Sequence, residues 1–138
     1  MGEMDDFNSK VVAEFRANAG VVGGMLAGAP VLLLHSTGAK SGKHYTHPLV
    51  YLADGDRWVI FASKAGAQTN PDWYHNLVAH KAAEIEVGTE RVAVRAEVVA
   101  GAERDRLFGK QASLMPVFAG YQQKTSRVIP VVALTRAR

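Results

Sequence analysis

Cysteine is absent from the 138 residues of this chain. Disulfides, thiolate metal sites and cysteine nucleophiles are therefore excluded. A long apolar run is lacking too: the longest weakly polar stretch, residues 21–34, contains glycines and a proline and is too short to span a membrane as a helix. The first residues, "MGEMDDF", are acidic where a secretory signal would be basic, so we expect a cytoplasmic protein.

A strong excess of one charge is also missing. The chain has 16 Lys and Arg against 13 Asp and Glu, a net charge of +3. This mild excess favours an anionic ligand or surface without requiring one. Aromatic residues make up 8% and follow no repeated aromatic-basic pattern, so nucleic-acid binding is not indicated. The length fits a single domain, residues 1–138, with an ordinary hydrophobic core.

Short runs of apolar and β-branched residues predict six strands. These runs are residues 31–34, 46–52, 58–62, 83–87, 92–99 and 128–134. The dipeptide Asp54-Gly55 predicts a hairpin between the second and third strands, and residues 87–90 predict another between the fourth and fifth. Together with the helices below, this pattern predicts an α+β fold that is mainly β. A compact antiparallel barrel is the simplest such fold, because it hides the edges of the sheet.

The N-terminal segment, residues 1–20, has the spacing of an amphipathic helix. Its apolar residues recur four apart, at Phe7, Val11, Phe15 and Ala19, with Val12 beside them. Asp5 or Asp6 is expected to cap the helix, and Gly20 to end it. We expect the apolar stripe to pack on the body of the protein; a peripheral contact with a membrane surface is the alternative.

Two further helices are expected between the strands. In "NPDWYHNLVAH", Asn70 is placed at the N-cap and Pro71 at the first helical position. The second helix covers residues 101–115. Its inward-facing residues are expected to be Leu107, Phe108, Ala112 and either Leu114 or Met115.

The stretch "HSTGAKSGKHYTHP", residues 35–48, forms a turn between two expected strands. A nucleotide-binding Walker loop is excluded, because three residues rather than four separate Gly38 from Gly42 and His44 follows Lys43. Backbone amides of a glycine-bearing turn can nevertheless bind an anion, with lysines adding charge. The residues available for this are Gly38, Lys40, Ser41, Gly42 and Lys43. A solvated hairpin remains the alternative.

The stretch "FASKAGAQTNPDWYHN" offers a second turn of this kind. A hydroxyl and an ammonium, from Ser63 and Lys64, end a strand close to the start of a helix, where anions are favoured. Aromatic residues follow in the first turn of that helix. The alternative interpretation places Trp73 in the core and leaves Lys64 solvated.

Histidines and serines do not form a recognisable catalytic or metal site. His44 and His47 would face opposite sides of a strand, and His75 and His80 different faces of a helix. We therefore expect no metal ion and interpret the histidines, including His35, as exposed polar positions. No serine lies in a Gly-x-Ser-x-Gly motif, so a hydrolase is not indicated.

Three ordered motifs, "TGAKSGKHYTHPLVYL", "VIFASKAGAQTNPDWYHNLVAH" and "RVIPVV", resemble the deazaflavin-dependent nitroreductase family of actinobacteria. The similarity runs from "FNSKVVAEFRANAG" almost to the C-terminus. The resemblance implies a split β-barrel related to the pyridoxamine-phosphate oxidase fold. It also implies the cofactor coenzyme F-420, a deazaflavin with a phosphodiester and an acidic oligoglutamate tail. Tyr45 departs from the family pattern, in which arginine is common.

The resemblance also implies which residues bind the cofactor. Those implied for its phosphate and tail are Lys40, Ser41, Gly42 and Lys43. Those on the strand that passes the deazaflavin are Thr46, Pro48 and Val50. The next strand and turn would contribute Ala62, Ser63, Lys64 and Gly66, and the helix would close the pocket with Trp73, Tyr74 and Asn76.

The expected activity is hydride transfer from reduced coenzyme F-420 to a quinone or another activated organic acceptor. On the substrate side the resemblance implies Met115, Phe118 and Tyr121, and Tyr121 is the candidate to donate a proton or hydrogen bond. Alternatives are a non-catalytic barrel that binds a cofactor or lipid, and a flavin enzyme or haem binder with the same barrel. Either a monomer or a dimer is compatible with the sequence.

Overall fold

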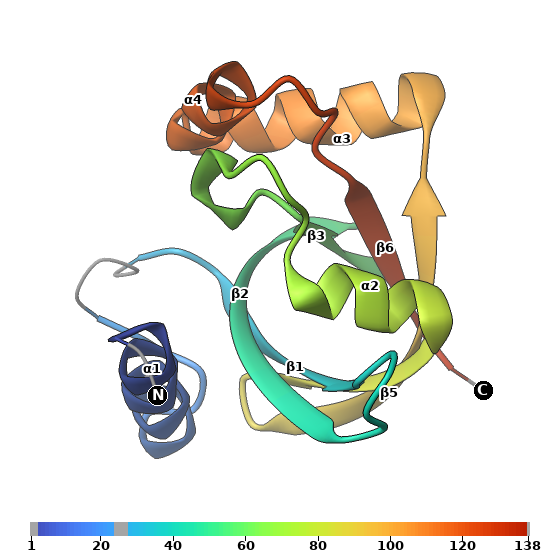
Figure 1. Ribbon diagram of the computed structural model, residues 1–138. Helices are drawn as coiled ribbons and strands as arrows, with labels where there is room; N and C mark the ends of the chain where they lie inside the picture. The colour runs from blue at the N-terminus through green and yellow to red at the C-terminus, as the bar shows by residue number, and fades with distance from the viewer. Residues whose placement is uncertain (1–2, 24–27, 138) are drawn as a thin grey trace.

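The computed structural model describes residues 3–23 and 28–137. The order of elements is α1 (Glu3–Ala17), β1 (Val31–Thr37), β2 (His44–Asp54), β3 (Arg57–Phe61), η2 (Lys64–Gly66), α2 (Asp72–Ala79), β4 (Ala82–Val87), β5 (Glu90–Val99), α3 (Gly101–Leu114), α4 (Val117–Lys124) and β6 (Val131–Arg136). Figure 1 shows a barrel with α2 lying across it, α1 beside it, and α3 and α4 forming a layer at one end.

The strands close into an antiparallel barrel in the order β1-β2-β3-β6-β5-β4. Closure removes the exposed strand edges that an open sheet would leave. The predicted α+β barrel is therefore confirmed. Both predicted hairpins are also present: Gly55 and Gly88 stand in their turns with φ of 58° and 59°, which glycine adopts without strain.

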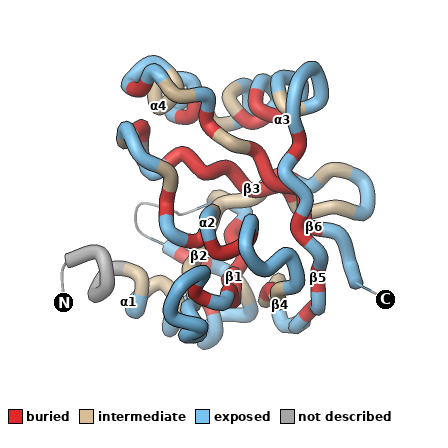
Figure 2. Tube along the Cα trace, turned by 45° about the vertical axis from the view of Figure 1, so that its right-hand side comes forward, coloured by how far each residue is buried: buried red, intermediate tan, exposed pale blue. Residues whose placement is uncertain are grey.

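The barrel interior is filled by side chains that alternate along the strands. Leu32 and Leu34 of β1 and Ile60 of β3 are fully buried there. Figure 2 shows the buried stretches of the chain in red. The helix α2 adds Trp73 and Leu77 to the same cluster. Each large apolar side chain buried in this way contributes about 1.5–3 kcal/mol to stability.

A second apolar cluster joins the outside of the barrel to α3 and α4. The ring of Phe61 packs edge-on against Phe108 (centroids 6.1 Å apart) and Phe118 (5.7 Å). The predicted helix 101–115 is confirmed to within one residue, with Met115 rather than Leu114 turned inward, since Leu114 is exposed. The short helix α4 was not predicted.

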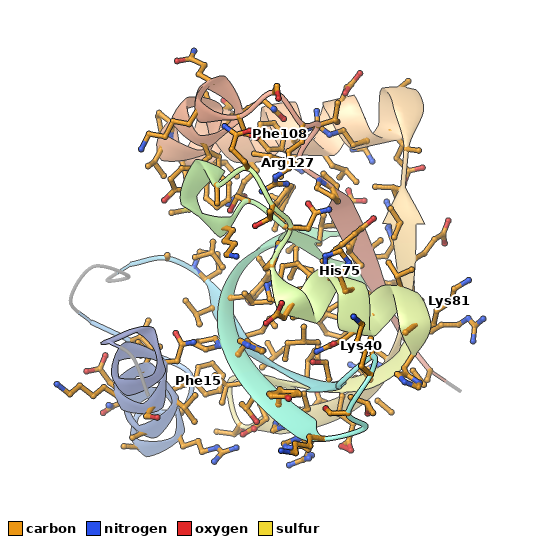
Figure 3. All side chains as sticks on the ribbon, viewed as in Figure 1. Phe15, Lys40, His75, Lys81, Phe108 and Arg127 are labelled. Carbon is orange, nitrogen blue, oxygen red and sulfur yellow. The ribbon has the colours of Figure 1, made fainter. Side chains whose placement is uncertain are left out.

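The helix α1 packs on the barrel through its apolar stripe, as predicted. Phe15 is 1% exposed and clusters with Val31 and Leu33 of β1 (Figure 3). The expected cap at Asp5 or Asp6 is wrong, because the helix begins at Glu3. The prediction that Gly20 ends the helix agrees with the structure. Gly20 has φ of 94°, and its N–H donates to the carbonyl oxygen of Phe15 (2.8 Å). The side chain of Phe7 lies outside the described residues.

The start of the last strand and the cap of α2 also differ from the sequence-based expectations. The last strand begins at Val131 instead of Val128, because the residue before it is Pro130, which has no N–H for a strand ladder. Asn70 does not cap α2. The helix is preceded by Pro71 in an extended conformation, and the side-chain oxygen of Asn70 instead accepts a hydrogen bond from Arg127 (2.7 Å).

Candidate functional site

The first lysine-bearing turn connects β1 to β2. Two backbone hydrogen bonds close this turn. The N–H of Gly38 donates to the carbonyl oxygen of Lys43 (2.7 Å), and the N–H of Gly42 donates to the carbonyl oxygen of Gly38 (3.0 Å). Gly42 has φ of 71°, and the Oγ of Ser41 accepts from the N–H of Lys43 (3.2 Å). Lys40 and Lys43 are exposed, so the turn presents two ammonium groups to solvent.

The second lysine-bearing turn follows β3 and contains η2. Lys64 has φ of 46°, a left-handed conformation that costs a non-glycine residue about 1–2 kcal/mol. Its ammonium lies 3.4 Å from the hydroxyl of Thr69. A Cβ on Gly66 would lie 2.8 Å from the Cβ of Lys124 and 2.9 Å from the carbonyl oxygen of Tyr121. The close approach that requires glycine here is therefore that of α4.

Both turns are attached to α2. The second turn runs directly into this helix, and the first is hydrogen-bonded to Asn76 within it. The side-chain oxygen of Asn76 accepts from the N–H of Ala39 (3.0 Å), while its amide nitrogen donates to the hydroxyl of Ser36 (3.3 Å). The structure thus places both turns against α2; Figure 1 shows the second turn at the α4 end of the molecule and the first beside the barrel.

The strand β2 begins at the first turn and ends beside β3. Thr46, Pro48 and Val50 are half-buried along it, and Val50 touches both the cluster under α1 and the cluster under α3 and α4. A cavity of about 470 Å³ lies between α1 and this part of β2. Its lining includes Tyr45 and Thr46 but neither Lys40 nor Lys64, so it reaches the strand and not the two lysines.

The residues of α2 that were expected to close the cofactor pocket occupy different environments. Trp73 is 5% exposed and packs in the barrel interior, which agrees with the alternative interpretation of it as a core residue. Asn76 is also buried and ties the first turn to the helix. Tyr74 is half-buried, with its ring edge-on to His75 (5.6 Å). Of the three, Tyr74 presents the most surface to a ligand.

The residues expected on the substrate side lie together at the end of α3 and in α4. Phe118 is buried, and Tyr121 packs edge-on against it (5.3 Å). Met115 and Tyr121 border the same cluster. Since Gly66 packs directly on the backbone of Tyr121, this group adjoins the second lysine-bearing turn.

A polar cluster under α1 was missed in the sequence. His35 is 6% exposed, so its interpretation as an exposed position is wrong. Its Nε2 lies 2.5 Å from a carboxylate oxygen of Glu86, and its Nδ1 lies 2.8 Å from the Nε2 of His44 and 3.2 Å from the hydroxyl of Thr46. Arg16 completes the cluster by donating to Glu86 at 2.8 Å.

The charge of this cluster is fixed mainly by Arg16. Its hydrogen bond to Glu86 outweighs the effect of burial, and with the contact from His35 it lowers the pKa of that carboxyl to about 2. Glu86 is therefore ionised at neutral pH and accepts a hydrogen bond from the Nε2–H of His35. Within the described residues, no group of three or more His, Asp or Glu side chains is arranged to hold a metal ion.

Arg127 is a further residue that was not expected to have a role, although it lies in the motif "RVIPVV". Its guanidinium reaches back to the second turn, where it donates to the carbonyl oxygens of Ala62 (3.1 Å) and Ser63 (2.9 Å). The motif alone could have drawn attention to an arginine beside a strand. Its partners, more than sixty positions earlier in the chain, could not be read from spacing.

The closed six-stranded barrel with its flanking helices defines a split β-barrel. A structure from Listeria innocua described as a candidate pyridoxamine 5'-phosphate oxidase shares this fold, with a TM-score of 0.59 and 11% identity over 99% of this chain and 95% of that chain. The chain belongs to the F420H(2)-dependent quinone reductase family, whose family model matches residues 8–136. This confirms the resemblance and the expected deazaflavin cofactor.

Individual relatives agree with this assignment. The chain is 42% identical over 133 residues to the F420H(2)-dependent quinone reductase Rv1261c of Mycobacterium tuberculosis, covering 90% of this chain and 86% of the relative. A solved structure described as an F420-H2 dependent reductase (FDR-A) is similar with a TM-score of 0.70 and 33% identity, covering 76% of this chain and 93% of that chain.

Proposed function

We propose that this protein is a reductase that uses reduced coenzyme F-420 to reduce a quinone or another activated organic acceptor. The observation that carries the proposal is membership of the F420H(2)-dependent quinone reductase family over residues 8–136. The match includes all six strands of the described barrel and both lysine-bearing turns. The acceptor class is that of the family and of the mycobacterial relative.

The side chains of the two turns fit the chemistry of this cofactor. Its phosphodiester and oligoglutamate tail need mobile cations, and Lys40, Lys43 and Lys64 are exposed ammonium groups on flexible stems. Its planar ring needs a neutral, partly apolar surface, which the half-buried strip of β2 provides. When bound, the deazaflavin supplies the hydride chemistry, and the protein supplies binding, orientation and exclusion of water.

We further propose that Tyr121 holds a hydrogen bond or a proton at the acceptor. Its ring borders the apolar cluster of Phe61 and Phe118, and its backbone adjoins the second turn. We expect Tyr121→Phe to lower kcat for quinone reduction by about a hundredfold or more, in the range of a lost proton donor. The affinity for coenzyme F-420 should change less than threefold. A kcat equal to that of the wild type would remove Tyr121 from the mechanism.

The test of the proposed function is a titration of the protein with coenzyme F-420, followed by oxidation of the reduced cofactor with a panel of quinones. We expect fluorescence to report binding and the return of visible absorbance to report turnover. The absence of binding would refute the proposal. Binding without turnover for any acceptor would support the non-catalytic alternative, and a protein that is yellow when purified would support ordinary flavin.

The lysines provide a direct variant for this assay. We expect the double substitution Lys40→Ala and Lys64→Ala to weaken cofactor binding by about tenfold or more, equivalent to about 1.4 kcal/mol. The matched control is Lys10→Ala with Lys110→Ala, which removes the same charge from exposed positions on α1 and α3. Equal losses in the two double variants would show that net charge, and not the two turns, determines the affinity.

Location and assembly belong to the same proposal. No helix in the described part of the chain is both long and apolar enough to cross a membrane. A peripheral contact through α1, within a cytoplasmic location, stays a prediction. The apolar side of this helix that carries Phe15 is already packed on β1. Pelleting of the full chain with liposomes tests the contact, and light scattering distinguishes a monomer from a dimer.

A further inference from the structure

Arg127 joins the segment before β6 to the second lysine-bearing turn, residues 62–70. Its guanidinium donates to the carbonyl oxygens of Ala62 (3.1 Å), Ser63 (2.9 Å) and Ala67 (2.9 Å). It also donates to the side-chain oxygen of Asn70 (2.7 Å). Figure 3 shows Arg127 between this turn and the helices α3 and α4. The four acceptors lie on both sides of Lys64 in the chain, so a single side chain fixes the two ends of the turn.

A guanidinium is the group that suits these contacts. It carries five N–H donors in a rigid planar fork, whereas a lysine ammonium has three donors at one point. Ala62 and Ser63 are buried, and buried carbonyl oxygens need hydrogen-bond partners. Within the turn, the N–H of Gly66 donates to the carbonyl oxygen of Ser63 (2.9 Å), and that of Ala67 to Lys64 (3.1 Å). These short-range bonds alone do not connect the turn to the barrel.

The conformation of Lys64 shows why the turn needs support. Its φ of 46° is unfavourable for a side chain with a Cβ, and such conformations persist where the surroundings hold them. Arg127 supplies that hold on one side. On the other, Gln68 donates to the carbonyl oxygen of Lys124 (3.0 Å) and accepts from the hydroxyl of Thr125 (3.1 Å).

The hydrogen-bond partners of Arg127 also differ in charge from those of Arg104, an arginine nearby. All four acceptors of Arg127 are neutral oxygens, and partial burial lowers the pKa of its guanidinium. Arg104, in contrast, contacts the carboxylate of Asp105 at 3.1 Å. None of these four contacts neutralises the guanidinium, so its positive charge remains available to an anion at the adjacent turn.

We infer that Arg127 is a positioning residue for the anionic part of the cofactor, since it holds the Lys64 turn in its binding conformation and places a positive charge beneath it. The identity of the ligand rests on the proposed function. The fixing of the turn does not, so the two parts can be tested separately.

The experiment compares Arg127→Lys and Arg127→Met with the control Arg104→Met. Arg104 donates to the carbonyl oxygen of Ile129 (2.9 Å) and to the side chain of Gln122 (2.8 Å), so it supports the same segment before β6 without contacting the 62–70 turn. We expect both Arg127 variants to bind coenzyme F-420 at least tenfold more weakly. The control should remain within threefold of the wild type, even if its thermal stability falls equally.

Hydrogen exchange on the cofactor-free protein is the second measurement. We expect the amides of Gly66 and Ala67 to exchange at least tenfold faster in both Arg127 variants, and at the wild-type rate in the control. If Arg127→Met does not fold, Arg127→Lys still gives both measurements. Ethylguanidinium, added at millimolar concentration to Arg127→Ala, should restore part of the cofactor affinity, which a general loss of stability would not allow.

Several results would overturn the inference. One is an affinity of Arg127→Met within threefold of the wild type, and another is unchanged exchange at Gly66 and Ala67. Equal losses in the control would show that general stability is responsible. If the wild type itself does not bind coenzyme F-420, the proposed function fails, and hydrogen exchange still decides whether Arg127 fixes the turn.

Discussion

Replacement of Asn76 by alanine tests whether α2 holds the first lysine-bearing turn in place. The substitution removes two hydrogen bonds, from the N–H of Ala39 (3.0 Å) and to the hydroxyl of Ser36 (3.3 Å). A hydrogen bond contributes about 0.5–1.5 kcal/mol, so the two together amount to about 2 kcal/mol. An unfolding entropy of about 2.1 cal/mol/K per residue, over 138 residues, converts 1 kcal/mol to about 3.4 °C. We therefore expect the Tm to fall by about 7 °C.

Calorimetry measures this change, and Asn18→Ala is the matched control. Asn18 is exposed and makes a single side-chain bond, to the carbonyl oxygen of Glu14 (3.0 Å), so its loss should lower the Tm by less than 2 °C. Hydrogen exchange at Ala39 and the affinity for coenzyme F-420 report on the turn itself. The reasoning would be refuted if Asn76→Ala lost stability as expected but kept both the protection of Ala39 and the wild-type affinity.

Two further substitutions separate stability from binding and define a pH dependence. Lys64→Gly relieves the left-handed strain and should raise the free energy of unfolding by up to about 1 kcal/mol, while it weakens cofactor binding. Lys64→Ala should weaken cofactor binding equally without raising the free energy of unfolding. Equal Tm values for the two variants would contradict the presence of strain at Lys64. The pKa of Glu86 falls from 4.5 to about 2 on folding. The ionised carboxylate therefore stabilises the folded protein fully above about pH 4.5, and this stabilisation is lost as the pH falls through 2. Urea titrations should therefore show that Glu86→Gln has a free energy of unfolding about 2 kcal/mol lower than the wild type at pH 7, a value that allows for partial solvent screening. This difference should shrink below pH 4. A difference that does not change with pH would argue against the ion pair.

Most of the barrel could be predicted because its strands follow a local pattern. Alternating apolar residues and glycine-bearing hairpins identified every strand within a few residues. Cross-strand pairing then extended β2 to His44, opposite Thr37, which no local propensity required. The helix α4 was missed because it is short, contains Gly120 and has an exposed Val117. Its stability comes from packing on the second turn and on Phe61, which are distant in sequence.

The lysines of the candidate site could be proposed from the sequence because they stand in glycine-bearing turns; their part in cofactor binding stays a prediction. The residues that position those turns could not be proposed in this way. Asn76 was expected to close the cofactor pocket, but nothing in the sequence indicated that its side chain is buried and bonded to Ala39, 37 positions away. His35 was read as exposed because its partner Glu86 lies 51 positions along the chain, on β4. Partners that meet only when the barrel closes leave no spacing signal.

In both lysine-bearing turns the lysine is exposed, and a polar side chain from another element bonds the turn: the buried Asn76 in the first and the partly buried Arg127 in the second. The first turn depends on Asn76, and the second on Arg127. An exposed lysine contributes modestly to binding, because solvent screens its charge and its flexible stem must be ordered. If the residue that bonds a turn is lost, the lysine is no longer held in place, and the turn must also be ordered when the cofactor binds. Loss of Asn76 or of Arg127 should therefore weaken cofactor binding at least as much as loss of the lysine in the turn that it bonds.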